Sequence, residues 1–239
     1  AQGIHLDGAF EEYMVIPAAA VQQGNVSKLG PDIQLDAAAA VEALSCVYNG
    51  FEHYQVHPGD NALIIGAGPI GAMHAMLALM AGAARVIVSD LSASRLALLK
   101  GILPGVIPYS GDGLQSEVMA LTGGAGLDVC VTACPSPAAQ ASSFELMAVG
   151  GRVCFFGGLP KGKDFVPLNT NIIHYRQLLV TGTSRASLAQ YRKCLRLVES
   201  GVVNLDPLIT HHYPLERIGD AFAGMAAAEG LKTVIRFAE

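Results

Sequence analysis

The sequence predicts an α/β fold in which helices cover both faces of a doubly wound parallel sheet. Between residues 61 and 184, short runs rich in Val, Ile and Phe alternate with helical segments of about 10 to 15 residues. The strand-like runs are largely apolar, as strands buried on both faces are. A glycine-rich turn joins the first run to the helix that follows it. This alternation is typical of βαβ units, whose strands pair in parallel.

Each element has its own signal. The stretch "GAFEEYMVIP" (8–17) alternates polar and apolar residues and predicts a strand. Asp36 is expected to cap a helix over 37–56, in which Asn49 and Gly50 mark either a break or a close packing point. The next strands are expected at 61–66, 85–90, 106–110, 127–134, 152–158 and 178–184, and the helices between them at 69–83, 92–102, 113–124 and 138–151. Beyond residue 184 we expect an amphipathic helix at 187–201, a turn and a helix within 209–230, and a closing strand at 232–237.

The segment 61–84 has no acidic or basic side chain, and its length alone would allow it to cross a membrane. Its first half, however, contains Gly66, Gly68, Pro69 and Gly71, which weaken or interrupt a helix. A strand, a turn and a helix explain the segment better than a membrane span.

Composition narrows the function classes. The chain has 239 residues, of which 51% are apolar and 15% charged, with a net charge of -5 and no cluster of Lys or Arg. These values argue against a nucleic-acid or membrane partner and favour a small molecule. The five cysteines lack CxxC spacing and are interpreted as buried free thiols, which fits a reducing cytoplasm. The chain begins without Met and in the middle of a domain pattern, so we expect an upstream segment.

The glycine-rich turn has the spacing GxGxxG and consists of Gly66, Ala67, Gly68, Pro69, Ile70 and Gly71. It follows a predicted strand and opens a predicted helix, the context in which this spacing indicates dinucleotide binding. Gly66 makes the tight turn, Gly68 lets the backbone approach a pyrophosphate, and Gly71 allows the helix to pack on the strand. The amino end of the helix, which includes Pro69 and Ile70, would receive the phosphates.

Asp90 ends the second strand, 24 residues after Gly66. A carboxylate at this place accepts hydrogen bonds from the ribose hydroxyls of the adenosine, and its charge repels a 2′-phosphate. The motif therefore predicts NAD in preference to NADP. Glycines that serve only a packed turn are the structural alternative.

With these motifs, the chain resembles the zinc-type medium-chain dehydrogenases, and within them the sorbitol (polyol) dehydrogenase-like branch. The resemblance covers nearly the whole chain and is carried by "GAFEEYMVIP", "VEALSCVYNG", "HPGDNALIIGAGPIG", "RVIVSDLSASRL", "GGRVCFFGGLPKG", "NIIHYRQLLVTGTS" and "LITHHYPLERIGDAF". It implies a Rossmann NAD-binding domain at 46–184, inserted in a GroES-like β-barrel catalytic domain. That barrel would be incomplete here, with a remnant at 1–45 and a return at 185–239.

The resemblance also implies further cofactor-binding residues. Arg95 matches a basic group that flanks the adenosine. Gly157 and Gly158 fall at a strand end where the backbone of the family passes the nicotinamide ribose, although a simple turn explains them as well. Lys232 matches a basic residue near the pyrophosphate, with a solvated lysine at a strand end as the alternative.

A zinc site is only partly represented. Zinc needs three or four N, S or O ligands in a tetrahedron, and of the positions that the family uses only Glu42 is present. It is followed by Ala43 where this branch usually has Pro, and an ordinary helix glutamate is the alternative. We therefore expect zinc in the full-length parent and not in this chain.

The histidines do not complete a zinc site. His53 and His57 are four residues apart across a helix end, where solvent-facing side chains are the commoner outcome. His211 and His212 would point to opposite faces of a strand. We expect His74 to have a core or interhelical role, because it lies on the helix behind the glycine turn.

These observations lead to three functional hypotheses. The first is an NAD-dependent dehydrogenase that oxidises a polyol or secondary alcohol by zinc-assisted hydride transfer, with little or no turnover by this chain alone. The second is a zinc-free NAD(P)H-dependent enone or quinone reductase, and the third is a dinucleotide-binding module without chemistry. The resemblance also implies a homo-oligomer, either a dimer or a tetramer.

Overall fold

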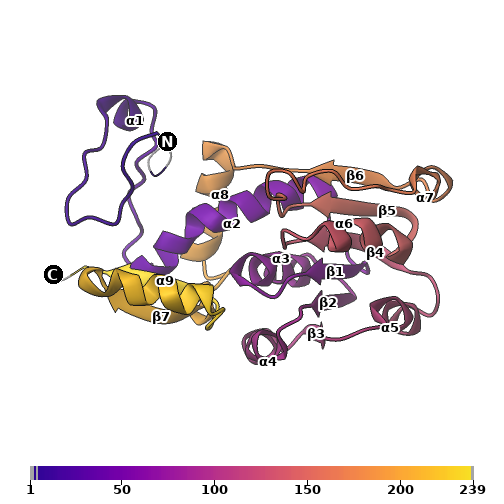
Figure 1. Ribbon diagram of the computed structural model, residues 1–239. Coiled ribbons are helices and arrows are strands. Elements are labelled where there is room, and N and C mark those ends of the chain that lie inside the picture. The colour runs from indigo at the N-terminus through magenta and orange to yellow at the C-terminus, as the bar shows by residue number, and fades with distance from the viewer. Residues whose placement is uncertain (1–2, 4, 238–239) are drawn as a thin grey trace. The chain divides into compact units, whose positions relative to one another are not determined.

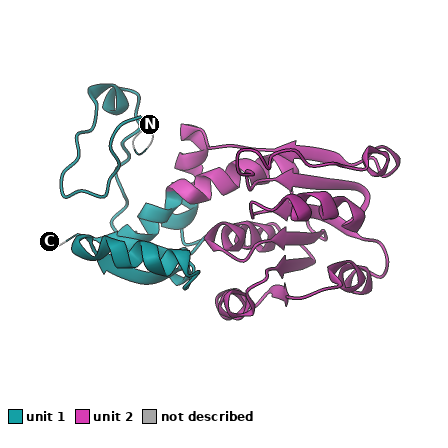
Figure 2. Cartoon of the chain, in the orientation of Figure 1, with its two compact units in different colours: residues 1–41, 195–239 teal, residues 42–194 magenta. Residues whose placement is uncertain are grey.

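The computed structural model describes residues 3 and 5–237, and the chain divides into two compact units (Figure 2). Unit 1 combines residues 1–41 with 195–239, and unit 2 comprises residues 42–194. Unit 1 is thus built from both ends of the chain, whereas unit 2 is continuous. The predicted domain boundaries after residues 45 and 184 stay predictions, because compactness alone does not identify a domain.

Unit 2 contains a six-stranded sheet in which every neighbouring pair is parallel. Its strands are β1 (Asn61–Ile65), β2 (Arg85–Ser89), β3 (Val106–Tyr109), β4 (Leu127–Thr132), β5 (Met147–Phe155) and β6 (Leu179–Gly182). The strand order is β3-β2-β1-β4-β5-β6, the arrangement of a Rossmann fold. The predicted α/β fold with a doubly wound parallel sheet is therefore confirmed.

Helices cover both faces of this sheet (Figure 1). They are α3 (Pro69–Met80), α4 (Ala93–Ile102), α5 (Leu114–Leu121) and α6 (Pro137–Ser143), with the short η1 (Phe144–Leu146) and α7 (Thr170–Tyr175) near the later strands. Side chains on β1 alternate between the two faces. Leu63 joins an apolar cluster with Val118 of α5 and Phe144 of η1, whereas Ile64 lies beneath α3. This two-sided burial explains why the strand sequences are almost continuously apolar.

Helix α2 (Leu35–Tyr54) runs through Asn49 and Gly50 without a break. Gly50 is buried, and a Cβ added there would lie 3.2–3.5 Å from side chains of other elements. Of the two interpretations of this pair, close packing is therefore the one that the structure shows. Asp36 lies inside the first turn of α2, two residues after the capping position, which Gln34 occupies, so the predicted cap is not formed by Asp36.

Unit 1 contains a two-stranded sheet, β7 (Ile209–Pro214) with β8 (Lys232–Arg236). Helix α9 (Ile218–Ala226) packs on both strands. The other elements outside unit 2 are α1 (Ala18–Gln22), η2 (Asp206–Leu208) and η3 (Leu215–Arg217), while α8 (Leu188–Glu199) crosses the boundary between the units. The closing strand at 232–237 is present, one residue shorter than predicted.

Three element predictions were wrong. Residues 209–214, within the stretch predicted to hold a turn and a helix, form strand β7. Residues 8–17 form bends and loop instead of a strand, with Tyr13 and Val15 almost fully exposed; alternation predicts a strand only where a neighbouring strand pairs with it. Residues 147–151, expected at a helix end, belong to β5. There Met147 pairs with Leu127 across a register irregularity.

Two further predictions concern the cysteines, expected to be buried free thiols, and the segment 61–84, expected not to cross a membrane. All five cysteines are free thiols, three of them buried and two half-buried. Among the helices in the described part of the chain, none combines the length and the apolar character that crossing a bilayer requires.

Candidate dinucleotide site

The glycine turn between β1 and α3 has the geometry that its spacing predicts. Gly66 adopts a φ of +117°, which L-residues rarely adopt, and its N–H donates to the carbonyl of Ser89 on β2 at 2.7 Å. A Cβ at Gly71 would lie 1.8 Å from the carbonyl oxygen of Gly66, so only glycine fits there. A Cβ at Gly68 would meet nothing within 4 Å. The first and third glycines are thus required by the fold, whereas Gly68 borders open space.

Asp90 directly follows β2 and holds the glycine turn from the side. One carboxylate oxygen accepts a hydrogen bond from the Ala67 N–H, and the other accepts one from the Ser92 N–H, both at 2.7 Å. Each oxygen retains acceptor capacity, because a carboxylate has about four lone-pair sites. Asp90 can therefore shape the turn and still accept hydrogen bonds from a ligand. The sequence motif did not indicate this bracing role.

Arg95 lies in the first turn of α4, which Ser92 caps by accepting a hydrogen bond from the Arg95 N–H at 3.3 Å. Its Nε is buried and has no hydrogen-bond partner within the described residues. A buried N–H without a partner is costly and usually marks a place where water or a ligand completes the bonding. Arg95 therefore offers a donor beside the Asp90 loop, at the predicted adenosine end of the site.

The backbone after β5 passes close to the segment after β4. A Cβ at Gly157 would lie 2.5 Å from the Cys134 carbonyl oxygen, and the Gly157 N–H donates to Thr132 at 2.8 Å. Gln140 of α6 donates through Nε2 to the Gly157 carbonyl at 3.1 Å. Gly157 is thus required by close packing, while Gly158 is exposed and a Cβ there would meet nothing within 4 Å.

Cys134 and Gln140 were not singled out from the sequence. The side chain of Cys134 also borders Gly66, and burial raises the pKa of its thiol, with the Asp90 carboxylate raising it further. Their positions depend on which strands are neighbours in the sheet, and no local pattern reports that. Cys134 therefore stays a thiol at neutral pH and serves as part of the wall.

The residues present fit a dinucleotide. Because all six strands are parallel, their carboxyl ends lie along one edge of the sheet, and there the chain places the open surface at Gly68, the unpartnered donor of Arg95 and the exposed Gly158. This edge, where the strand order reverses between β1 and β4, is where Rossmann folds bind their cofactors.

His74 is fully buried on α3, behind the glycine turn. Its Nδ1 shares a hydrogen bond with the Tyr54 hydroxyl of α2 at 2.9 Å. Burial lowers its pKa to about 3, so the imidazole is neutral at physiological pH. The expected core and interhelical role of His74 agrees with this placement.

Glu42 is exposed on α2, and its carboxylate accepts a hydrogen bond from the Cys46 thiol at 3.6 Å. Burial, followed by the charge of Glu42, raises the pKa of the Cys46 thiol to about 11. No group of three or more His, Cys, Asp or Glu side chains in the described part of the chain could hold a metal. The described residues therefore do not fit a zinc site.

The remaining histidines have structural partners. His53 Nδ1 lies 2.8 Å from the Asn49 carbonyl oxygen, and His57 Nδ1 lies 2.6 Å from a guanidinium nitrogen of Arg152. That Arg152 forms a largely buried ion pair with Asp60 at 2.7 Å. His53 and His57 thus bind different groups and do not form a shared metal site.

In unit 1, adjacent His211 and His212 also have different partners. His211 contacts the Thr210 hydroxyl, whereas His212 pairs with Asp36 at 2.8 Å. Hydrogen bonds from Arg236, and then from His212, lower the pKa of Asp36. Lys232 begins β8 in the same unit, so its predicted role near the pyrophosphate stays a prediction.

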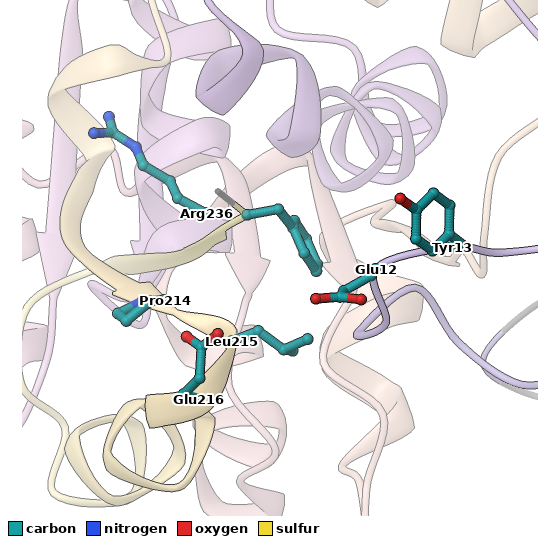
Figure 3. A pocket seen from close by; sticks show the side chains of 7 residues that line it. Glu12, Tyr13, Pro214, Leu215, Glu216 and Arg236 are labelled. Atoms are coloured by element: carbon teal, nitrogen blue, oxygen red, sulfur yellow. The ribbon is translucent and has the colours of Figure 1, made fainter. Parts of the chain in front are cut away.

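A separate pocket of about 580 Å³ lies in unit 1. Figure 3 shows Glu12 and Leu215 facing one another across it, while the guanidinium of Arg236 points away. Its lining includes none of the residues predicted to bind the cofactor. We assign it no role.

Comparison with known proteins agrees with this geometry. A family model described as "Zinc-binding dehydrogenase" matches residues 69–200, more than half of the chain. The chain belongs to the zinc-binding dehydrogenase family. The match includes the second half of the glycine turn and the strands β2 to β6.

Individual proteins resemble the chain over nearly its whole length. An L-threonine 3-dehydrogenase of Bacillus velezensis is 36% identical over 98% of the chain, which spans 66% of that protein. Alcohol dehydrogenase TADH from Thermus sp. ATN1 superposes with a TM-score of 0.86 at 26% identity, covering 98% of this chain and 66% of its own. A zinc-binding dehydrogenase from Sinorhizobium meliloti 1021, bound to NADP, superposes with a TM-score of 0.86 at 27% identity. The superposition covers 98% of this chain and 68% of that protein. The chain thus spans slightly less than two thirds of the curated relative.

Proposed function

We propose that this zinc-binding dehydrogenase chain binds NAD and serves the oxidation of a polyol or another secondary alcohol. One observation supports the proposal above the others: the turn at Gly66–Gly71 leaves open space at Gly68, and Asp90 braces that turn with both carboxylate oxygens. The secondary hydroxyl of L-threonine, the substrate in the name of a 36% identical relative, belongs to the same chemical class.

In this proposal the chain's own residues bind and orient the cofactor. The amino end of α3 receives the pyrophosphate, since its free N–H groups favour anions. Asp90 accepts hydrogen bonds from the ribose hydroxyls, and the Nε of Arg95 supplies a donor beside them. Gly158 leaves room for the nicotinamide half at the end of β5. When bound, NAD accepts a hydride from the carbinol carbon of the substrate.

We propose NAD in preference to NADP because of the charge of Asp90. Its oxygens are held in place by the N–H groups of Ala67 and Ser92, so the carboxylate cannot easily turn away from a 2′-phosphate. The nearest basic side chain along this loop is Arg95, whose guanidinium would have to offset that repulsion. One structural relative binds NADP, which makes the preference worth measuring directly.

Zinc is not part of the function that we propose for these residues. Glu42 is hydrogen-bonded to Cys46, and the described residues offer no group of three His, Cys, Asp or Glu side chains that could hold a metal. We derive no step through a metal. We propose instead that the 239-residue chain binds the cofactor with little turnover by itself. In this proposal the complete reaction requires a longer protein, such as the relative of which this chain spans 66%.

We also propose that the chain self-associates through the β6 edge of its sheet. At the opposite edge, β3 contains Pro108, which cannot donate to a further strand. Strand β6 has neither proline nor a charged residue, and its Leu179 and Val180 are exposed. Unprotected edges of this kind favour pairing with another strand.

The cofactor proposal is tested by titrating the purified chain with NADH and NADPH, following nicotinamide fluorescence. We expect saturable NADH binding and a Kd for NADPH at least about 10-fold higher, a difference of about 1.4 kcal/mol. Hydride transfer is then assayed with NAD and sorbitol or L-threonine, with and without added zinc. Absence of NADH binding by the folded chain would refute the proposal, and tighter NADPH binding would favour the reductase hypothesis.

A further inference from the structure

A buried polar cluster lies where α2, α3 and the end of β6 meet. His74 of α3 has no exposed surface, and its Nδ1 is bonded to the Tyr54 hydroxyl. Its Nε2 has no hydrogen-bond partner in the part of the chain that the structure describes. One of the two ring nitrogens is therefore satisfied and the other is not.

Thr183 directly follows β6 and supplies a second atom of this kind. Its Oγ1 is buried and likewise finds no hydrogen-bond partner in residues 3 and 5–237. Both side chains pack against Gly50 of α2. A Cβ added at Gly50 would lie 3.4 Å from Thr183 Oγ1 and 3.5 Å from His74 Cε1, the ring carbon bonded to Nε2.

Two unsatisfied polar atoms beside one glycine call for a shared partner. Buried polar groups in folded proteins are almost always hydrogen-bonded, to the chain or to an ordered water. Because the imidazole is neutral, Nε2 is a donor if Nδ1 accepts from Tyr54 and an acceptor if Nδ1 donates. Water can donate and accept, so it suits either tautomer, and it also suits the hydroxyl of Thr183.

We propose that one buried water molecule lies beside Gly50 and bridges His74 Nε2 and Thr183 Oγ1. The bridge ties α3, the helix behind the glycine turn, to the carboxyl end of β6. Phe156, which directly follows β5, closes the site from the side: its ring lies 4.5 Å from the His74 ring, centroid to centroid. The site is thus enclosed by α2, α3 and the ends of two neighbouring strands.

This site has a consequence for the cofactor, which rests on the proposed function. Phe156 precedes Gly157 and Gly158, the predicted contacts of the nicotinamide half, whereas Asp90 serves the adenosine half from the other side of β1. A water bridge at the ends of β5 and β6 would hold the residues that contact the nicotinamide half of the cofactor. It would not affect the residues that contact the adenosine half. Thr183 is therefore a positioning residue for the nicotinamide half.

The decisive variant is Thr183→Val, which keeps the shape of the side chain and removes the hydroxyl. If a water bridges the two side chains, the variant removes one of its anchors and leaves His74 Nε2 without a stable hydrogen-bond partner. We then expect the Tm to fall by about 2–6 °C. Thr183→Ser, which keeps the hydroxyl, should retain the wild-type Tm. If the hydroxyl has no partner, Thr183→Val leaves the Tm unchanged or raises it, and the proposal is overturned.

Two further measurements separate the water site from the cofactor role. A high-resolution crystal structure of the wild-type chain should show a water within hydrogen-bond distance of both atoms; a direct bond between His74 and Thr183 instead would overturn the site. In titrations, Thr183→Val should raise the Kd for NADH about 3- to 10-fold and change that for AMP less than about 2-fold. Equal changes for both ligands would overturn the positioning role. Wild-type chain that binds neither ligand would refute the proposed function, while the Tm and crystallographic tests of the water site would still stand.

Discussion

Separate alanine substitutions at Gly68 and Gly71 distinguish a glycine required by the ligand from one required by the fold. At Gly71 the new Cβ would lie 1.8 Å from the carbonyl oxygen of Gly66 and 2.9 Å from its carbonyl carbon. Backbone cannot yield as a flexible side chain does, so the turn or α3 must shift. We expect a loss of about 2–3 kcal/mol in the free energy of unfolding, which lowers the Tm by about 4–12 °C.

Gly68 should behave in the opposite way. Its φ of -72° and ψ of -178° suit any L-residue, and a Cβ there would meet no atom within 4 Å. Gly68→Ala should therefore change the free energy of unfolding by less than about 0.5 kcal/mol. Its methyl group would occupy the surface that a pyrophosphate approaches, so the Kd for NADH should rise at least about 10-fold, or about 1.4 kcal/mol.

Thermal denaturation without cofactor and NADH fluorescence titration measure the two effects independently. Gly101→Ala on α4 is the matched control, because a Cβ there also meets nothing within 4 Å and lies in another element. It should leave the NADH affinity near wild type and leave the Tm unchanged or raise it by up to about 2–4 °C, because alanine favours a helix over glycine. The reasoning is refuted if Gly68→Ala binds NADH as wild type does, or if Gly71→Ala melts at the wild-type temperature.

Three other predictions concern the cofactor preference, the pH dependence and the assembly. Asp90→Asn keeps one acceptor oxygen for two backbone N–H groups, so NADH binding should weaken and the NADPH-to-NADH affinity ratio should rise; an unchanged ratio in paired titrations would contradict this. Because burial lowers the pKa of His74 to about 3 and a histidine in an unfolded chain titrates near about 6.5, the unfolded state takes up the proton first. The contribution of His74 to the free energy of unfolding is therefore complete above about pH 6.5, and it falls by up to about 1.4 kcal/mol per pH unit as the pH drops toward 3. His74→Gln should remove this contribution to the pH dependence of the free energy of unfolding, measured by urea denaturation. Val180→Lys should shift the chain toward monomer in light scattering if β6 mediates self-association, and an unaltered mass would exclude that edge.

Much of unit 2 was predictable because its signals are local. Apolar runs, helical segments and the glycine spacing each depend on neighbours in sequence. They placed β1 and β2 within one residue and α3 within three residues. The strand predicted at 8–17 failed because a strand needs a partner, which alternation cannot report. The start of β5 at Met147 was missed for a similar reason: its pairing with Leu127 is decided across the sheet.

The amino-acid sequence by itself determined the class of fold, the glycine turn and the acidic residue after β2, since steric limits at Gly66 and Gly71 act over a few residues. Only the tertiary structure decided that Asp90 braces the turn, that Gly157 packs on Cys134, and that His74 and Thr183 both pack against Gly50. These contacts join residues from 23 to 133 positions apart. Residues so far apart in the sequence come into contact only when the strands take their order in the sheet.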